Sequence, residues 1–374
     1  MIDFIYLDEP DMIAAGVTDM VRCVDSMEDA LVAMRRGDYV MAGENHNSHG
    51  AMLTFPAEPE FEGMPKDGPD RRVMAMPAYL GGRFRTTGVK WYGSNAENRK
   101  KGLPRSILMF ALSDSDTGAP LAIMSANLLS AYRTGAVPGV GVKHLAREDA
   151  ETVAVVGPGV IAKTTVEATL ALRPSVRTVK VKGRSAAGVA SFAEFVAERF
   201  PGVSVVPVDS VEEALAGADI VISTATTGSG GLESYAYFPA EALKPGALVL
   251  VPAPARFDDE LILSERSRLV VDSSGLYEAW REEYGAGAYD LLGIPGIHFL
   301  DLVEEGRIPG SRVEEIADIA TGERPGRRND EEIIIYSVGG MPVEDVAWAT
   351  DVYHRAVERG IGRRLNLWES PALA

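Results

Sequence analysis

The spacing of apolar residues differs between two parts of the chain. Between about residues 50 and 125, short apolar runs are broken by glycine, proline and charged residues, as in RVMAMPAYLGG, TTGVKWYG and SILMFALSD. Short runs bounded by turn residues predict the strands of an antiparallel or mixed sheet. The turn DTGAPL is followed by LAIM (121–124), which we expect to be the returning strand of a hairpin.

From about residue 150 to 340, longer apolar runs alternate with helical patterns. The runs are TVAVVG, TVKVKGRS, VSVVPV, DIVISTAT, ALVLVPAP and SRLVVD. Continuous apolar strands separated by helices predict a parallel sheet that is covered on both faces, which is the doubly wound α/β arrangement. We expect the last run, EIIIYSVGG (332–340), to form an edge strand of this sheet.

Helical patterns precede and follow the two predicted sheets. Residues 8–41 predict short helices, one of which we expect to begin at an N-cap Asp25 with Glu28 three positions later. Residues 341–362 carry apolar side chains at helical spacing and predict an amphipathic helix.

The expected fold class is therefore α/β, with two domains. A Rossmann-type doubly wound parallel sheet, residues 132–340, is expected to be inserted into a second, α+β domain. That second domain is made from both chain ends, residues 1–131 and 341–374.

Charge and cysteine content narrow the possible functions. The net charge of −17 argues against binding to nucleic acid or to a membrane surface, because both need a cationic footprint. The single cysteine, Cys23, excludes an internal disulfide and a cysteine-cluster metal site, and the five histidines lack metal-ligand spacing. No apolar run approaches the roughly 20 residues that span a bilayer, and MIDFIYLDEPDMIAAG lacks the basic residues of a signal peptide. We expect a cytoplasmic protein without a metal.

One motif predicts a bound dinucleotide. VAVVGPGVIA (153–162) joins a predicted strand to a predicted helix and fits the pattern GxGxxG/A. Gly157 would make the tight turn, and Gly159 would let the backbone approach the pyrophosphate at the helix N-terminus. The residues expected to bind the phosphates are Gly157, Pro158, Gly159, Val160 and Ile161.

The end of the next strand bears on which dinucleotide binds. NAD sites usually place an Asp or Glu there to bind the ribose hydroxyls, whereas TVKVKGRS ends in Arg184 and Ser185 and has no acid. A carboxylate would repel a 2′-phosphate, and a guanidinium can hold it bidentately. The sequence favours NADP(H) and leaves NAD(H) possible.

Five stretches carry a family resemblance. They are GVKWYGSNAENRKKGLPR, DTGAPLAIM, SAYRTGAV, GPGVIA and SVGGMPVEDVAWA. In this order they resemble the ornithine cyclodeaminase/mu-crystallin family, and the resemblance covers nearly the whole chain. It implies a substrate-binding and dimerisation domain made from the chain ends, an NAD(P) domain between them, and a homodimer. Because the family includes cyclodeaminases, ketimine reductases, alanine dehydrogenases and opine-type dehydrogenases, the activity has to be argued from the site.

The resemblance also implies roles for individual residues. The family's two carboxylate-binding residues fall on Lys90 and Arg133, which suits the carboxylate of an amino or keto acid in a largely dry cleft. Thr134, expected at the same helix start, is the implied phosphate contact. Further cofactor contacts are implied at Thr224, Ala225, Ser337 and Val338. Glu344 and Asp345 are expected to cap or order the final helix.

The chain departs from the cyclodeaminase pattern at three places. Pro254 occupies the position of the catalytic Asp, so the proton shuttle is expected to be absent, although the neighbouring Asp258 or Asp259 leaves that alignment open. An early arginine is missing from GENHNSHG, where His49 or His46 is the nearest acid/base candidate.

The third departure is Arg105, which stands where cyclodeaminases have a threonine. The motif KWYGSN…GLPR resembles the siderophore-pathway branch of the family, N-(2-amino-2-carboxyethyl)-L-glutamate dehydrogenase, whose substrate carries several carboxylates. We expect Lys90 and Arg105 to face an anionic substrate, and the basic residues 99–101 between them to form a solvated loop.

These observations predict an NAD(P)-dependent oxidoreductase that acts on the C–N bond of an amino acid, opine or imino acid. Hydride would pass between the nicotinamide and the substrate α-carbon while Lys90 and Arg133 hold the substrate carboxylate. Two alternatives stay open. One is an ornithine cyclodeaminase that forms proline and ammonia, and the other is a non-catalytic, mu-crystallin-like protein that binds NADPH and a small ligand.

Overall fold

The computed structural model describes residues 1–225 and 231–373, which form two compact units. Unit 1 comprises residues 1–19, 36–133 and 341–374, and unit 2 comprises residues 20–35 and 134–340. The sequence prediction placed residues 20–35 in the first domain, whereas the structure groups them with the second. Within the described residues, no helix combines the length and the apolar character needed to cross a membrane.

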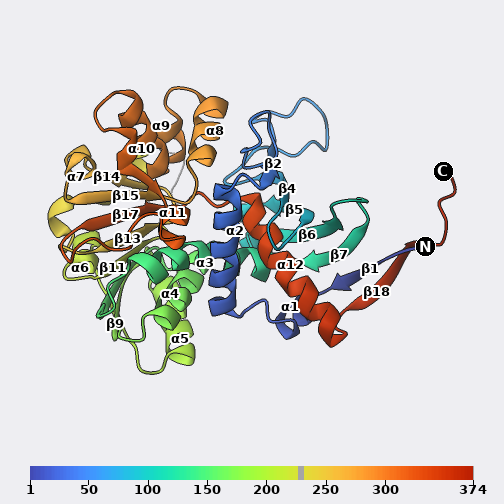
Figure 1. The fold of residues 1–374 in the computed structure, drawn as a ribbon, viewed down its shortest axis with the longest axis horizontal. Coiled ribbons are helices and arrows are strands. Elements are labelled where there is room, and N and C mark those ends of the chain that lie inside the picture. The colour runs from blue at the N-terminus through green and yellow to red at the C-terminus, as the bar shows by residue number, and fades with distance from the viewer. Residues whose placement is uncertain (226–230, 374) are drawn as a thin grey trace. The chain divides into compact units, whose positions relative to one another are not determined.

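Unit 1 is built around a mixed sheet with the strand order β18-β1-β7-β6-β5-β4-β2, with β3 paired to β4 (Figure 1). Its strands are β1 (Ile2–Leu7), β2 (Tyr39–Met41), β3 (Ala51–Thr54), β4 (Arg72–Leu80), β5 (Thr86–Ser94), β6 (Ser106–Asp114), β7 (Pro120–Ser125) and β18 (Arg363–Trp368). β1 and β7 run parallel, and the other pairs are antiparallel. The predicted hairpin is confirmed, because β6 and β7 pair antiparallel.

The helices of unit 1 cover one face of its sheet. α1 (Glu9–Ala14) packs on β1 and β7, the other helices of the unit are the first part of α3 (Asn127–Leu145) and α12 (Pro342–Arg359), and the 3₁₀ turn η1 (Ala96–Lys101) joins β5 to β6. α12 packs on β4, β5 and β6. Alternate residues of β5 therefore point into a core that includes Phe110 and Trp348, both fully buried. This alternation directs Lys90 inward, towards α12.

Unit 2 contains an all-parallel sheet with the order β10-β9-β8-β11-β13-β17-β15-β16. Its strands are β8 (Thr152–Val156), β9 (Thr178–Lys182), β10 (Ser204–Pro207), β11 (Ile220–Ser223), β13 (Leu248–Val251), β15 (Ser267–Val271), β16 (Val313–Glu315) and β17 (Ile333–Ser337). β12 (Ala236–Phe238) and β14 (Ala255–Phe257) form a separate parallel pair. The predicted doubly wound sheet is confirmed. β17 was expected at an edge, and it lies instead between β13 and β15.

Helices cover both faces of this parallel sheet. The helices of unit 2 are the rest of α3, α2 (Met20–Arg35), α4 (Val160–Leu172), α5 (Ala186–Arg199), α6 (Val211–Leu215), α7 (Asp259–Leu263), α8 (Ser274–Tyr284), α9 (Ala288–Leu292), α10 (Pro295–Glu304) and α11 (Ile316–Ala320), with the 3₁₀ turns η2 (Leu232–Ser234), η3 (Ala240–Ala242) and η4 (Gly310–Arg312). Figure 1 shows α4 and α5 on one side of the sheet and α8 to α10 on the other. The strand order reverses between β8 and β11, which is where such sheets bind ligands, beyond the carboxyl ends of their strands.

Helix α2 differs from its prediction. It begins at Met20, so Asp25 lies inside it and is not its N-cap. Asp25 and Glu28 instead pair with Lys143 of α3, at 2.9 and 3.0 Å. α2 also packs against α4 and α11, which explains why it belongs to unit 2.

Candidate active site

The glycine-rich segment forms a tight turn between β8 and α4 in unit 2. Gly157 has φ +92°, a conformation that favours glycine, and a Cβ there would come within 2.4 Å of Ala225 Cα. Thr224 Oγ1 donates to the carbonyl oxygen of Gly157 at 2.7 Å. The predicted Thr224 and Ala225 thus shape the turn, because they lie directly against its first glycine.

The residues after this turn fit a bound pyrophosphate. Gly159 is the N-cap of α4 and makes no side-chain cap, so no side chain satisfies the first amide groups of the helix. A Cβ on Gly159 would meet no protein atom within 4 Å, and Val160 at the first helical position is exposed. Uncapped N–H groups beside open space are what an anion at a helix N-terminus requires. Pro158 packs beside Gly183 and supports the turn from its other side.

The second strand of the sheet ends beside this turn. Gly157 N donates to the carbonyl oxygen of Lys182, the last residue of β9, at 2.9 Å. The exposed Arg184 follows, and Ser185 is the N-cap of α5, where its hydroxyl accepts from Gly188 N at 3.2 Å. Arg184 and Ser185 therefore lie at the strand end where ribose contacts are made in this fold.

A buried carboxylate, which the sequence analysis did not predict, binds the backbone of the SVGG segment that begins at the last residue of β17. Asp272, at the end of β15, accepts hydrogen bonds from Gly339 N at 2.7 Å, Gly340 N at 3.2 Å and Tyr277 Oη at 2.6 Å. Burial raises the pKa of Asp272, although these bonds oppose the shift. The sequence could have indicated this role of Asp272, because it directly follows the apolar run of a buried strand in VVDS. An acid at such a place needs buried hydrogen-bond partners.

Ser337 and Val338 were predicted to lie near the nicotinamide. Both are buried, and Ser337 Oγ accepts the hydrogen bond from Gly296 N at 2.9 Å. Val338 N donates to the carbonyl oxygen of Val251 at 3.1 Å. The Ser337 hydroxyl thus accepts a bond from the start of α10, and the role of Ser337 and Val338 near the nicotinamide stays a prediction.

Unit 1 contains a buried cluster of four charged side chains, which we call the Lys90 cluster. It consists of Lys90 on β5, Arg133 on α3, and Glu344 and Asp345 in the first turn of α12. Lys90 Nζ donates to Asp345 Oδ2 at 2.7 Å. Arg133 donates from Nε to Asp345 Oδ1 at 2.9 Å and from Nη1 to Glu344 Oε2 at 2.7 Å. Lys90 is 2% exposed, Arg133 4%, and the two acids are fully buried.

This environment shifts the pKa values of the cluster. Burial lowers the pKa of Lys90 to about 8, and the nearby Arg133 adds to the shift while Asp345 opposes it. Burial would raise the pKa of Asp345, but Arg133 and Lys90 hold that pKa below its ordinary value. The two carboxylates likewise raise the pKa of Arg133 against the effect of burial. The cluster therefore pairs two basic with two acidic side chains, and the pKa of its lysine is lowered to about 8.

The acids of the cluster were expected only to cap or order the final helix. Glu344 does so, because its Oε2 accepts from Met341 N at 3.0 Å, but it also binds Arg133. Asp345 joins Lys90 to Arg133, which the prediction missed. The signal was present in VEDVAWA, where two adjacent acids interrupt an apolar helix start and must be paired when that face is buried.

The chain was compared with known proteins. The model of the ornithine cyclodeaminase/mu-crystallin family matches residues 16–360. The chain belongs to this family. N-((2S)-2-amino-2-carboxyethyl)-L-glutamate dehydrogenase of Staphylococcus aureus is 26% identical over 369 residues, which cover 98% of this chain and 99% of the relative.

Two solved structures of the family extend the comparison. The Thermococcus litoralis Δ¹-pyrroline-2-carboxylate reductase, in complex with NADH and L-proline, has a TM-score of 0.75 at 26% identity and covers 96% of this chain and 99% of its own. An archaeal alanine dehydrogenase dimer with bound NAD has a TM-score of 0.73 at 25% identity. The match covers 98% of this chain and 100% of the alanine dehydrogenase chain. The predicted family is thus confirmed, and these relatives act on amino acids or imines with NAD or NADH.

One residue implied by the family resemblance lies differently from the prediction. Thr134 was expected at a helix start, but it lies inside α3. A Cβ on the next residue, Gly135, would come within 2.4 Å of Thr164 Oγ1, so α3 packs closely on α4 at this point. The chain before β3 carries His49, and Gly50 packs against Met76, which is opposite Lys90 in the sheet. His49 thus lies on the segment beside the Lys90 cluster.

Arg105 lies directly before β6, and its Nη1 is 3.1 Å from Asp70 Oδ2. Burial lowers the pKa of Arg105, and the nearby Arg72 and Arg99 lower it further. The side chain is therefore held beside other cations in unit 1. In the solvated loop between Lys90 and Arg105, Lys100 pairs with Glu97, with 76% of its side chain exposed.

The segment after β13 contains Pro254, the residue predicted to stand in place of the family's catalytic Asp, and two acids, Asp258 and Asp259. Asp258 accepts from Tyr237 Oη at 2.7 Å. Asp259 pairs with His298 at 2.7 Å and with Arg307 at 2.7 Å. Both neighbouring acids are thus bound to side chains of unit 2, and the described residues contain no metal-ligand cluster.

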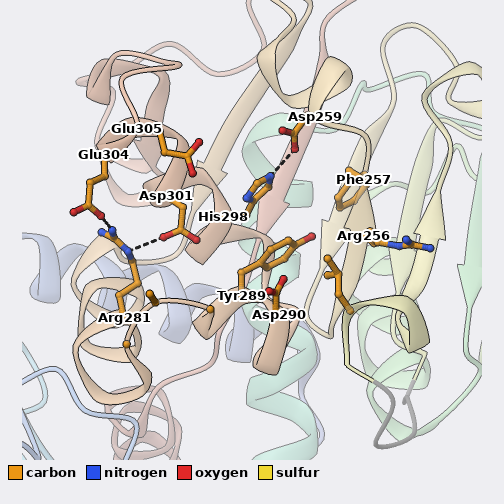
Figure 2. A pocket seen from close by; sticks show the side chains of 14 residues that line it. Arg256, Phe257, Asp259, Arg281, Tyr289, Asp290, His298, Asp301, Glu304 and Glu305 are labelled. Atoms are coloured by element: carbon orange, nitrogen blue, oxygen red, sulfur yellow. Dashed lines mark hydrogen bonds and ion pairs between the residues drawn. The ribbon is translucent and has the colours of Figure 1, made fainter.

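A cavity of about 740 Å³ lies beside this segment in unit 2 (Figure 2). His298 lies between Asp259 and Tyr289, and its ring stacks on Tyr289 with centroids 4.6 Å apart. The two arginines that line the cavity are neutralised, since Arg256 pairs with Glu233 and Arg281 pairs with Asp301 and Glu304. The cavity therefore lacks the cationic character that a carboxylate substrate needs.

Proposed function

We propose that the chain is an NAD(P)-dependent oxidoreductase that acts on the C–N bond of an amino acid, imino acid or opine. The observation that carries the proposal is the buried Lys90 cluster in a chain whose other unit has a dinucleotide-binding turn. In the reducing direction, an imine, NAD(P)H and a proton give an amine and NAD(P)⁺. The bound nicotinamide supplies the hydride, and the protein supplies binding, orientation and protons.

The Lys90 cluster can hold a substrate carboxylate without breaking its own ion pairs. An ammonium has three N–H donors and a guanidinium has five. Lys90 uses one on Asp345 and one, at 3.4 Å, on Ser130, and Arg133 uses its Nε and Nη1 on the two acids. The remaining donors suit a carboxylate, and Asp345 fixes their spacing because it binds both cations.

Lys90 can also donate or accept the proton that imine chemistry needs. Burial lowers its pKa to about 8, so it can change protonation state near neutral pH, as general acid–base catalysis requires. The alternative of ornithine cyclodeamination is less well supported, because Pro254 cannot transfer a proton and Asp258 and Asp259 bind other side chains.

The absorbance of reduced nicotinamide tests the proposed reaction. Imines, pairs of keto acids with amines, opines and amino acids are screened with both cofactors. We expect a change in nicotinamide absorbance that is stoichiometric with product. Conversion of ornithine to proline with no net change would identify a cyclodeaminase, and tight NADPH binding without turnover on the whole panel would identify a binding protein.

The pKa of Lys90 predicts how carboxylate binding depends on pH. A pKa lowered to about 8 means that Lys90 is charged below this pH and loses its proton above it. The inhibition constant of an amine-free carboxylate, such as a 2-hydroxy acid, should therefore rise about tenfold per pH unit above that value. The variant Lys90→Arg keeps its charge and should lose this dependence. An unchanged titration in Lys90→Arg would contradict the assignment.

The residues after β9 favour NADP(H) over NAD(H). Arg184 is exposed at the strand end, and Ser185 Oγ, which accepts from Gly188 N, keeps its hydroxyl hydrogen as a further donor to a 2′-phosphate. Arg184→Asp should weaken NADP(H) binding about tenfold or more while changing NAD(H) binding little. The exposed Arg266 supplies the matched control, Arg266→Asp, and dissociation constants are measured for both cofactors. NADP(H) affinity unmoved in Arg184→Asp would refute the role.

The proposed assembly is a homodimer that pairs through the uncovered face of the unit 1 sheet. Trp91, Ile107 and Met109 are 51%, 50% and 52% exposed, and Trp91 and Met109 are cross-strand partners on the face opposite Lys90. Contiguous exposed apolar side chains of this size mark an interaction surface. We expect Met109→Glu to give a monomer in size-exclusion chromatography with light scattering, while Leu291→Glu, at an exposed leucine of unit 2, leaves the mass unchanged. A dimeric Met109→Glu would place the interface elsewhere.

A further inference from the structure

A second group of cations lies at the far end of the strand that carries Lys90. Arg72 begins β4, Arg105 precedes β6, and Ser94 ends β5 between them. The sheet register places Arg72 opposite Ser94. Asp70 holds the group together, because its carboxylate accepts from the Ser94 hydroxyl at 2.7 Å and pairs with both arginines.

This group carries more positive than negative charge. Two guanidinium groups have about ten N–H donors between them, and one carboxylate cannot use them all. Arg72 and Arg99 both lie near enough to Arg105 to disfavour its charge. The side chains of Arg72 and Arg105 are 31% and 39% exposed, so they are accessible to a ligand. A second carboxylate at this place would use the remaining donors and reduce the repulsion.

Tyr92 links this group to the Lys90 cluster. Lys90, Tyr92 and Ser94 alternate along β5 and therefore face the same side of the sheet. Lys90 Nζ lies 5.8 Å from the centroid of the Tyr92 ring, and Arg72 Cζ lies 5.9 Å from the same centroid. Because each cation is within 6 Å of one point, the two are at most about 12 Å apart. One small molecule with two separated carboxylates can reach both.

We propose that Arg72 and Arg105 form a second anion subsite, which binds the distal carboxylate of a dicarboxylic imino or amino acid. This rests on the proposed function, because the first carboxylate is the one at Lys90 and Arg133. Asp70 acts as a positioning residue that holds both guanidinium groups in place. The two arginines determine specificity and take no part in hydride transfer, since they bind the substrate away from its reacting carbon.

The test compares two oxo acids that differ only at the distal end. kcat/KM is measured for 2-oxoglutarate and for 2-oxopentanoate, each with ammonium and NAD(P)H, and binding of both acids in the presence of NADP⁺ is measured by calorimetry. The wild type should prefer 2-oxoglutarate by about tenfold to a hundredfold. Arg72→Gln and Arg105→Gln should each reduce this preference about tenfold and leave 2-oxopentanoate within about threefold.

The matched control is Arg85→Gln, at an exposed arginine in the turn at the opposite end of the β4–β5 hairpin. Arg85→Gln should keep the wild-type preference for 2-oxoglutarate over 2-oxopentanoate. If Arg72→Gln and Arg105→Gln lowered kcat/KM equally for both acids, or left the preference unchanged, the subsite would be overturned. If the wild type reduces neither acid with ammonium, the calorimetric preference still decides the subsite, and the panel of imines, keto acid–amine pairs and opines decides the proposed function separately. If Arg72→Gln does not fold, Arg105→Gln gives the answer.

Discussion

Replacing Lys90 with methionine is expected to lower kcat/KM by about 10²- to 10³-fold, because truncating one member of a buried, hydrogen-bonded charge pair removes about 2–5 kcal/mol of binding. Lys90 Nζ bonds to Asp345 at 2.7 Å in a place with almost no exposure to solvent. The substrate carboxylate would lose one of its two cations, and the buried Asp345 would repel it. Steady-state kinetics in the reducing direction measure the effect.

A structural cause of this loss can be separated from a functional one. Lys90→Met leaves Asp345 with one partner fewer and should lower the free energy of unfolding by about 3 kcal/mol. In the double variant Lys90→Met/Asp345→Asn the unpaired charge is also removed, so stability should return while kcat/KM stays low. Recovery of activity together with stability would mean that Lys90 only supports the fold. A kcat/KM within threefold of wild type in Lys90→Met would remove it from the site.

Replacing Gly159 with valine is expected to raise the dissociation constant of NAD(P)H about a hundredfold, which corresponds to ~2.7 kcal/mol. Gly159 has φ −93°, which valine can adopt, and a Cβ there meets no protein atom within 4 Å. The fold should therefore tolerate the side chain. Pyrophosphate binding should be weakened, because the valine side chain would fill the space through which the backbone approaches the pyrophosphate.

Nucleotide fluorescence titration measures this affinity, and thermal unfolding without nucleotide measures the fold. Gly157→Ala provides the contrast, since its φ is +92° and its Cβ would lie 2.4 Å from Ala225 Cα, so it should lose both stability and binding. Gly217→Ala has φ +72° and open space, and should lose only a little stability. Unchanged NAD(P)H affinity in Gly159→Val would show that the nucleotide binds elsewhere.

The parallel sheet of unit 2 could be predicted because its strands are buried on both faces and appear in the sequence as continuous apolar runs. Strand order could not be predicted in the same way. β17, the last strand of the sheet in sequence, was predicted at an edge, yet it pairs with β13 and β15. Its neighbours are set by contacts far apart in sequence. Asp25 was wrongly predicted to be an N-cap for a similar reason. Its partner Lys143 is distant in sequence, and no local sequence pattern predicts this ion pair.

The candidate site was predictable where a residue's chemistry depends on local geometry. Gly157 and Gly159 follow from the turn between a strand and a helix. Lys90 and Arg133 came from the family resemblance, and neither the composition nor the spacing of the chain would have paired them. Asp345 was assigned to helix capping because its two partners come from β5 and α3, and only the folded chain brings them together.

A side chain named by resemblance can also have a structural contact. Ser337 near the nicotinamide stays a prediction, and its hydroxyl accepts from Gly296 N and so orders the start of α10. The buried Asp272 accepts hydrogen bonds from the backbone amides of Gly339 and Gly340, which follow in the same segment. A sequence motif preserves the position of such a residue, whereas its hydrogen-bond partner depends on the tertiary fold.

Transfer of deuterium from a labelled cofactor tests the central claim most directly. NAD(P)H carrying deuterium at C4 is incubated with an imine, or with a 2-oxo acid and an amine, and the product is analysed by mass spectrometry. The account predicts one deuterium on the α-carbon of the amino acid, at a rate that falls steeply in Lys90→Met. A product without deuterium, or equal transfer to an analogue that lacks the α-carboxylate, would contradict a hydride transfer directed by the carboxylate at Lys90 and Arg133.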